Sequence, residues 1–264
     1  MQLSADQHRE AAVAIVAAED TRRWTEPVSA RWPDADVDDA YRIALAVRDL
    51  KVAAGRRVTG HKVGLTSKAM RTMFEAAEPD YGFLYDDWFV AEGSVVPPER
   101  LNRPLVEQEV AFVMGRRLSG PSVHAADVIR ATDFVLPALE IVDSRFRERG
   151  PTMLVDSIAD AASCGLVVLG GNPVGLTDID VRRISGSLLV NGEIMETGSA
   201  AAVLGNPINA VAWLANKLHE FGVAMEPGDV ILSGSFVRAV PFAAGDSIVA
   251  LFDQLGEVSV TIGP

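Results

Sequence analysis

Two stretches of the chain show the apolar pattern of interior β-strands, and both carry acidic side chains. The first, Leu105–Met114, contains Glu107 and Glu109 followed by mainly apolar residues. Because successive side chains of a strand point to opposite faces, Glu107 and Glu109 are expected to project from the same face. The second, Phe134–Val142, has Glu140 as its one charged residue. An unpaired carboxylate is costly in so apolar a segment, so something must compensate its charge.

Two interpretations of these acids are open on the pattern alone. Three carboxylates from two interior strands can form an all-oxygen site, and such a site suits a hard divalent cation such as Mg²⁺ or Mn²⁺. Alternatively, Glu107 and Glu109 line a solvated strand face while Glu140 pairs with an arginine. The first interpretation makes Glu107, Glu109 and Glu140 candidate metal ligands.

The start of the chain has the pattern of helices. Ser4 and Gln7 form a capping box that begins one helix. A second helix is predicted to begin at Asp36 and to end at Gly55, which can close it in a left-handed cap. No candidate chemistry falls in this part, so we expect it to pack on the rest of the chain or on a neighbouring subunit.

Later segments are predicted to be mainly strands and tight turns. Asn191-Gly192 between apolar runs is typical of a β-hairpin, and one further helix is expected from Pro207 to Gly222. The order predicts an α+β fold whose mixed or antiparallel sheet closes on itself. Residues 1–55 should form a helical segment packed on a catalytic body of residues 56–264, together one structural unit.

The composition excludes several classes of partner. The 264 residues are 48% hydrophobic and 23% charged, which is ordinary for a globular protein with a sizeable core. A formal net charge of -12 leaves no basic patch to neutralise phosphates, so we expect neither nucleic acids nor anionic membranes as partners. The apolar run Ala11–Ala18 is too short for a membrane span and lacks the flanks of a signal peptide.

The single cysteine, Cys164, also limits the possibilities. It rules out an intramolecular disulfide framework and a cysteine-rich zinc site, and it points to a reducing compartment, the cytoplasm. A lone cysteine of this kind could be a nucleophile. We expect a small buried residue instead.

A glycine-punctuated stretch, Thr59–Lys68, contains Lys62. It is not a phosphate-binding loop, because that motif requires glycine immediately before the lysine and Ser or Thr immediately after it. A lysine aimed into a pocket could stabilise an enolate or carry a proton, whereas the pattern alone favours a solvated loop lysine. His61 is expected to be structural. Further on, Glu78–Gly82 is predicted to be a turn with Asp80 at its centre.

Several motifs follow one another in an order that can be compared with a known family. They are Gly60–Met70, Glu78–Gly82, Glu107 with Glu109, Pro137–Arg145, Asp156–Asp160, Ala201–Gly205 and Gly234–Phe236. Over nearly the whole chain they resemble the hydratase/decarboxylase branch of the fumarylacetoacetate hydrolase superfamily. The resemblance implies N-terminal helices followed by a mixed β-roll.

The resemblance also implies a site and a reaction. Mg²⁺ or Mn²⁺ would be held by the acids that match Glu107, Glu109 and Glu140, and Lys62 falls on the family's active-site lysine. Asp80 falls on an acid of the hydratases, where the decarboxylases carry an apolar residue. We therefore expect a metal-dependent hydratase of aromatic catabolism that adds water to a 2-oxo-4-enoate, with 2-oxohept-4-ene-1,7-dioate as the favoured substrate.

Other activities of the superfamily remain as alternatives. The chain could be a 4-oxalocrotonate-type decarboxylase or a 2-hydroxypentadienoate hydratase, and less favoured options are an acylpyruvate-type hydrolase or a non-catalytic partner subunit. Hydrolases of the superfamily carry a water-activating histidine on the short helix after the glycine-rich turn, and Ser67–Phe74 has none. Two departures near the expected site bear on substrate preference: Asp160-Ala161-Ala162 replaces the usual Asp-Asn-Ala, and Leu105 replaces a basic residue.

Three residues are predicted to bind substrate. Arg238 could grip a distal carboxylate, because arginine recognises carboxylates in a bidentate way, or it could be an ordinary surface charge. Ser235 and Leu65 are the other two candidates. The resemblance further implies a homo-oligomer and, as an additional partner, a related decarboxylase.

Overall fold

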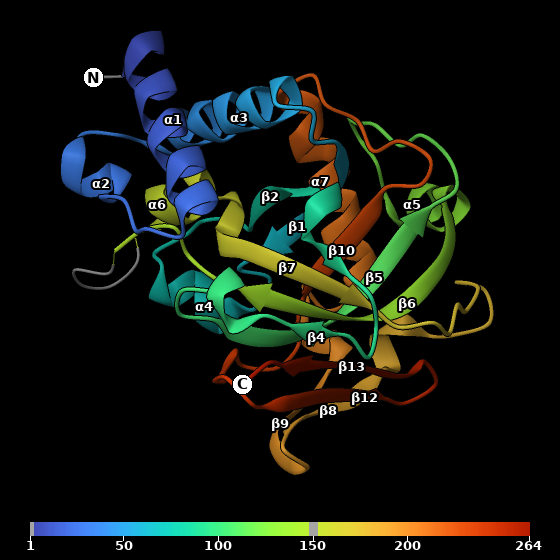
Figure 1. The fold of residues 1–264 in the computed structure, drawn as a ribbon. Coiled ribbons are helices and arrows are strands. Elements are labelled where there is room, and N and C mark those ends of the chain that lie inside the picture. Colours follow the sequence, from blue (N-terminus) through green and yellow to red (C-terminus); the bar gives the residue numbers. More distant parts are fainter. Residues whose placement is uncertain (1–2, 148–152) are drawn as a thin grey trace.

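The N-terminal helices lie beside a large curled sheet, and a smaller sheet lies below it in the view of Figure 1. The computed structural model describes residues 3–147 and 153–264. Its α-helices are α1 (Ala5–Thr21), α2 (Val28–Arg31), α3 (Val37–Ala53), α4 (Lys68–Met73), α5 (Ala125–Ala131), α6 (Leu154–Ala159) and α7 (Pro207–Glu220). Its strands are β1 (Val58–Gly64), β2 (Asp80–Tyr85), β3 (Phe89–Val90), β4 (Val95–Val96), β5 (Leu105–Met114), β6 (Thr132–Val142), β7 (Cys164–Leu169), β8 (Ser185–Val190), β9 (Glu193–Ser199), β10 (Val230–Ser235), β11 (Val240–Pro241), β12 (Ser247–Phe252) and β13 (Gly256–Ile262). Within these described ranges, no helix combines the length and hydropathy needed to span a bilayer.

Helices α1 and α3 begin where their capping residues predict, and α3 ends close to the predicted Gly55. Ser4 and Gln7 form the predicted capping box at the start of α1, and Asp36 begins α3 with its side chain bonded to the backbone N–H of Asp39. Gly55 follows α3 with a φ of 93°, a left-handed conformation that glycine adopts without steric cost. The helical prediction for this part of the chain is confirmed.

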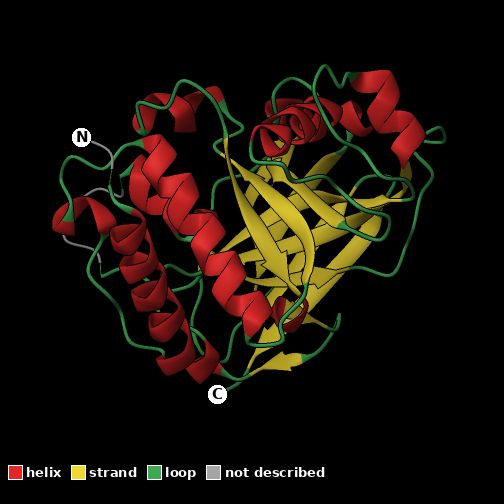
Figure 2. Ribbon diagram, turned by 90° about the horizontal axis from the view of Figure 1, so that it is seen from above, coloured by secondary structure: helices red, strands yellow, loops and turns green. Residues whose placement is uncertain are grey.

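In the part of the chain that the structure describes, the larger sheet has eight strands and is mixed, within the prediction of a mixed or antiparallel sheet. Its order is β2-β1-β10-β5-β6-β7-β3, and β11 pairs with the first residues of β5. The pairs β1–β10 and β3–β7 are parallel, whereas β5 and β6 pair in antiparallel fashion over nearly their whole length. Figure 2 shows helices beside these strands, and strands of the smaller sheet also contact β5, β6 and β7. The larger sheet is therefore covered by both helices and strands.

The smaller sheet has the order β4-β13-β12-β8-β9. Strands β8 and β9 form the predicted hairpin at Asn191-Gly192, whose φ values of 53° and 81° are those that a tight two-residue turn requires. The helix predicted from Pro207 to Gly222 is α7, which packs on β10. Both predictions are confirmed.

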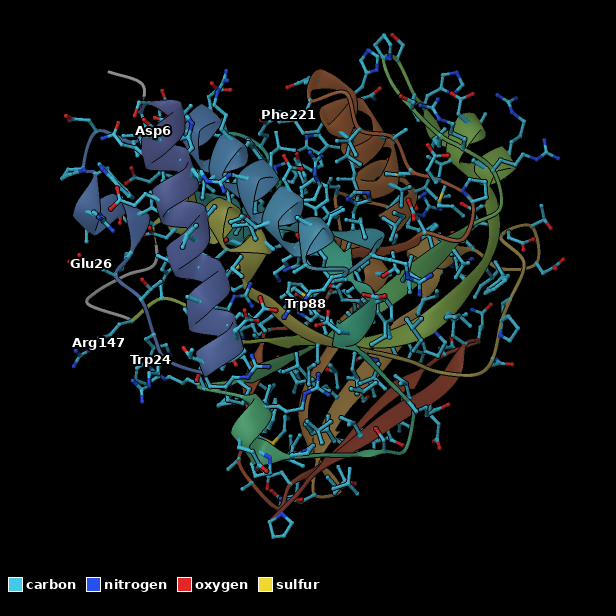
Figure 3. All side chains as sticks on the ribbon, turned by 45° about the horizontal axis from the view of Figure 1, so that its top comes forward. Asp6, Trp24, Glu26, Trp88, Arg147 and Phe221 are labelled. Atoms are coloured by element: carbon cyan, nitrogen blue, oxygen red, sulfur yellow. The ribbon has the colours of Figure 1, made fainter. Side chains whose placement is uncertain are left out.

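Buried polar contacts join the N-terminal helices to the rest of the chain. Glu19 on α1 accepts hydrogen bonds from Lys51 on α3 (2.5 Å) and from Trp88 Nε1 (3.0 Å). Figure 3 places Trp88 between the N-terminal helices and the sheet. Near the start of α3, the ring of Tyr41 lies 5.1 Å from that of Phe221, which follows α7. The N-terminal helices therefore pack on the body, while the division at residue 55 stays a prediction.

The turn predicted over Glu78–Gly82 is wrong in its second half. Asp80 begins β2, and every residue of this strand is buried. Gly82 permits the close packing, because a Cβ there would lie 2.2 Å from the carbonyl oxygen of Ala161. Asp80 is therefore an interior strand residue rather than the cap of a turn.

Candidate metal centre and active site

Three glutamates from β5 and β6 converge at one point of the larger sheet. Glu107 lies directly opposite Glu140 in the β5–β6 register, and Glu109 follows two residues later on the same face. One carboxylate oxygen from each side chain lies within 4.8 Å of the other two. Glu109 and Glu140 are fully buried and Glu107 is partly exposed. The alternative of a solvated face is wrong, because Glu109 is inaccessible to solvent.

These carboxylates repel one another unless a cation lies between them. Burial and the charge of Glu140 raise the pKa of Glu107 to about 7. Burial, Glu140 and Glu107 together raise the pKa of Glu109 well above its ordinary value. Glu109 Oε1 and Glu140 Oε2 are buried and accept no hydrogen bond from the described residues, whereas Glu140 Oε1 lies 2.9 Å from Lys62 Nζ. The cluster fits a hard divalent cation, which prefers oxygen ligands and would offset the repulsion.

The backbone of Gly234 fixes the orientation of Glu109. Gly234, in β10, donates its N–H to Glu109 Oε2 at 2.7 Å. Its φ of 105° is one that residues other than glycine rarely adopt, and a Cβ would lie 2.4 Å from Thr66 Oγ1. The hydrogen bond leaves Oε1 as the oxygen of Glu109 that has no partner.

Lys62 lies in the middle of β1 beside these acids. Its Nζ is 2.9 Å from Glu140 Oε1 and donates a hydrogen bond to the carbonyl oxygen of Ala162, also at 2.9 Å. Burial alone would lower the pKa of Lys62, but the charges of Glu140 and Glu107 outweigh it and raise the pKa, so the ammonium group is charged. The interpretation as a solvated loop lysine is wrong, because β2 and β10 enclose β1 on both sides.

Asp80 lies at the start of β2, opposite Gly64 of β1. A Cβ at Gly64 would lie 2.1 Å from Asp80 Oδ1, so glycine is needed to make room for this carboxyl group. Ser157 donates its hydroxyl to Asp80 Oδ2 at 2.9 Å, and the buried Oδ1 accepts no hydrogen bond from the described residues. Burial raises the pKa of Asp80, and the opposing effects of Lys62 and Ser157 are smaller. Asp80 is thus a buried carboxyl group with one unpaired oxygen.

The predicted substrate-binding residues lie in different environments. Ser235 is directly opposite Glu109 in the β10–β5 register, and its hydroxyl contacts the carbonyl of Val237 at 2.9 Å. Leu65 follows β1 in a left-handed conformation with a φ of 55°. The side chain of Arg238 is 87% exposed and pairs with Glu196 at 3.0 Å. Their roles in substrate binding stay predictions.

Sequence reasoning missed several neighbours of the candidate site. Ser157 and Gly234 fall within the motifs that we compared with the known family, but their hydrogen bonds depend on tertiary contacts that no pattern reveals. Cys164 lies beside Glu140, and burial and this acid raise the pKa of its thiol well above the ordinary value. The expectation of a small buried cysteine is confirmed. His61 is buried as well, which lowers its pKa to about 3 and leaves it neutral.

The chain belongs to the fumarylacetoacetate hydrolase family, because the family model described as fumarylacetoacetate (FAA) hydrolase C-terminal matches residues 52–263. It is 42% identical to the 2-oxo-hept-4-ene-1,7-dioate hydratase of Escherichia coli, over 96% of this chain and 98% of that one. It is 40% identical to 2-keto-4-pentenoate hydratase 1 of Dechloromonas aromatica (strain RCB), over 95% of each chain.

A solved structure shares the whole fold. This is the 4-oxalocrotonate decarboxylase from Pseudomonas putida G7, complexed with magnesium and adipate. The TM-score is 0.95 and the identity 36%, and the match covers 98% of each chain. The expected fold, N-terminal helices followed by the mixed β-roll of this family, is therefore confirmed.

Proposed function

We propose that this protein is a metal-dependent hydratase that adds water to a 2-oxo-4-enoate. The substrate that we favour is 2-oxohept-4-ene-1,7-dioate, converted to 4-hydroxy-2-oxoheptanedioate in the meta-cleavage pathway of aromatic catabolism. The observation that carries the proposal is the buried group of Glu107, Glu109 and Glu140 with Lys62 at its side. The identities of 42% and 40% to two hydratases support it.

We assign the three glutamates as ligands of one divalent cation, Mg²⁺ or Mn²⁺. When bound, the cation would supply Lewis-acid stabilisation of the negative charge that develops on the 2-oxo group of the substrate. Glu109 Oε1 and Glu140 Oε2, which have no partner among the described residues, support the assignment. A second support is the magnesium in the complex of the decarboxylase that is 36% identical to this chain.

We assign proton transfer to Lys62 and Asp80. Shifting the substrate double bond before water adds requires removing a proton from one carbon and delivering one to another. Lys62 presents a charged ammonium group that Glu140 and the carbonyl of Ala162 hold in place. Asp80 presents the unpaired Oδ1, and its raised pKa suits a group that both accepts and returns a proton. The burial of both residues keeps bulk water away from these transfers.

We retain Arg238, Ser235 and Leu65 as candidate substrate ligands. Ser235 and Leu65 are supported by their neighbours, since one is opposite Glu109 and the other follows Gly64. Arg238 would have to exchange its ion pair with Glu196 for a carboxylate of the substrate. Replacing Arg238 by Gln should then raise KM for a dicarboxylate more than for a monocarboxylate.

We further propose a cytoplasmic homo-oligomer, with a related decarboxylase as an additional partner. The alanine-rich α1 supports an interface role, since its Val13 side chain is exposed although apolar. Light scattering on the purified protein tests the oligomer, and co-purification with a decarboxylase tests the second partner.

Decarboxylation of 4-oxalocrotonate is the second candidate function. The observation that favours it is the TM-score of 0.95 to a 4-oxalocrotonate decarboxylase. Asp80 favours hydration, because a buried carboxyl group with an unpaired oxygen can accept and donate the protons that are transferred when water adds. Loss of CO₂ involves no addition of water.

A spectrophotometric assay separates the two candidates. The Mg²⁺-loaded protein is mixed with 2-oxohept-4-ene-1,7-dioate, 2-hydroxypenta-2,4-dienoate or 4-oxalocrotonate, and loss of diene absorbance and release of CO₂ are both followed. Absorbance loss without CO₂, absent from Glu109→Gln and retained by the exposed control Glu257→Gln, supports the hydratase. CO₂ from 4-oxalocrotonate would favour the decarboxylase. No reaction with any of the three would refute the proposal.

A further inference from the structure

A turn of unusual backbone conformation lies against the candidate active site. Three consecutive residues between α6 and β7 have left-handed φ values, namely 54° at Ala161, 50° at Ala162 and 58° at Ser163. None of them is glycine, and each such residue costs free energy because its Cβ crowds the following carbonyl oxygen. A run of three persists only if the surroundings enforce it.

The side chain of Arg145 forms hydrogen bonds to the residues on both sides of this turn. Its Nε donates to Asp160 Oδ1 at 2.5 Å and its Nη2 to the carbonyl oxygen of Asp160 at 2.6 Å, just before the turn. Its Nη1 donates to the carbonyl oxygen of Cys164, just after the turn. One rigid guanidinium group thus fixes the positions at which the chain enters and leaves the left-handed segment.

Asp160, just before the turn, makes further hydrogen bonds that hold it. Its Oδ2 accepts hydrogen bonds from the backbone N–H of Arg145 at 3.1 Å and from Ser163 Oγ at 3.2 Å. Arg145 is 4% exposed and Asp160 is 1% exposed, so these bonds form away from water, where unpaired partners would be costly.

The centre of the turn contacts Lys62. The carbonyl oxygen of Ala162 accepts the hydrogen bond from Lys62 Nζ, which also lies 2.9 Å from Glu140 Oε1. The direction of this carbonyl depends on the left-handed backbone on either side of it. If the backbone relaxed, this carbonyl would turn away, and the ammonium group of Lys62 would lose one of its two acceptors.

We propose that Arg145 and Asp160 are positioning residues of the active site. They hold Ala161–Ser163 in the left-handed conformation, and through the carbonyl of Ala162 they place Lys62 against Glu140. The inference rests on the proposed function only for its kinetic readout. A purely structural role for the buried ion pair would change stability without a specific effect on Lys62.

The test combines Arg145→Lys with second-site glycines. Lysine keeps a charge for Asp160 but cannot reach both ends of the turn, so the turn should relax. We expect kcat to fall by about 10- to 100-fold, since misplacing a reacting group by about 1 Å can cost about 100-fold, while KM and the dissociation constant for Mg²⁺ stay unchanged. Ala161→Gly added to this variant should restore most of the lost kcat, because glycine adopts the left-handed conformation without the steric cost.

The matched control is Gln254→Gly in the same Arg145→Lys background. Gln254, in the turn between β12 and β13, also has a left-handed φ, 70°, but lies outside the candidate site. We expect Gln254→Gly to raise stability without restoring kcat. Equal restoration of kcat by both glycines, or a normal kcat in Arg145→Lys, would overturn the proposal.

Two further measurements keep the proposal decidable. If Arg145→Lys does not fold, the milder Ser163→Ala removes one hydrogen bond to Asp160 and should show a smaller loss of kcat, again restored by Ala161→Gly. If the wild-type protein hydrates none of the substrates, the proposed function fails, and a crystal structure of the variant decides the positioning role. We expect the contact of Lys62 Nζ with the carbonyl of Ala162 to be lost there, and its retention would contradict the inference.

Discussion

Replacing Glu107 by Gln is expected to make the metal-free protein more stable at neutral pH. Glu107 has a folded-state pKa of about 7 against an ordinary value of 4.5, because burial and Glu140 disfavour its charge. The folded state therefore holds this proton at pH values where the unfolded chain has released it. The contribution of Glu107 to the free energy of unfolding is therefore most favourable below about pH 4.5 and falls as the pH rises toward about 7.

The size of the effect follows from the shift. A difference of about 2.5 pKa units corresponds to about 3 kcal/mol at 1.4 kcal/mol per unit. This is an upper limit, because Glu107 is partly exposed and solvent screens part of the repulsion. We expect Glu107→Gln to gain about 1–3 kcal/mol over the wild type at about pH 8 and almost nothing at about pH 4, where Glu107 is protonated in both the folded and the unfolded state.

Denaturant unfolding in EDTA at these two pH values measures the difference directly. The exposed Glu257→Gln is the matched control and should unfold like the wild type at both. Added Mg²⁺ should stabilise the wild type more than Glu107→Gln, since the cation takes over the compensation of charge. Identical pH dependence of wild type and Glu107→Gln would refute the reasoning that these carboxylates repel one another.

Three further predictions address single residues. Lys62→Met should lower kcat by about 10²- to 10⁴-fold with a native circular dichroism spectrum, and normal turnover would show that Lys62 moves no proton. Gly64→Ala should lower kcat by about 10- to 100-fold, because the new Cβ would lie 2.1 Å from Asp80 Oδ1 and must displace that carboxyl group. Stopped-flow absorbance measures kcat, and an unchanged value would argue against a role for Asp80. His61, whose pKa burial lowers to about 3, contributes stability that is complete above about pH 6.5 and is lost as the pH falls toward 3. Between about pH 6.5 and pH 4.5, the free energy of unfolding of His61→Leu, measured with urea, should fall by roughly 2–3 kcal/mol less than that of the wild type. An equal fall in both proteins would contradict a buried, neutral His61.

The parts of the fold that follow from local pattern could be predicted from the sequence. The alternation in Leu105–Met114 gives the bounds of β5, and the caps at Ser4 and Asp36 give the starts of two helices. The same alternation put Glu107 and Glu109 on one face. Only the structure shows that Glu140 lies opposite Glu107, because strand register depends on pairing across the chain.

The burial of particular side chains and the left-handed backbone conformations could not be predicted from the sequence. Lys62 looked like a loop residue because its burial arises from β2 and β10, which are distant in sequence. Asp80 looked like part of a turn because Pro79 and Gly82 flank it, yet Gly82 serves close packing within a strand. Alanine has no preference for left-handed backbone, so nothing in the sequence indicated the conformation at Ala161.

The most direct test of the central claim is to return Mg²⁺ to EDTA-treated protein during the assay with 2-oxohept-4-ene-1,7-dioate. Hydration should be absent before the addition and should begin on it in the wild type. Glu109→Gln should stay inactive at the same Mg²⁺ concentration, because it keeps the fold but loses one of the clustered carboxylates. Full activity in EDTA, or Mg²⁺-dependent activity of Glu109→Gln equal to that of the wild type, would contradict a function built on this metal centre.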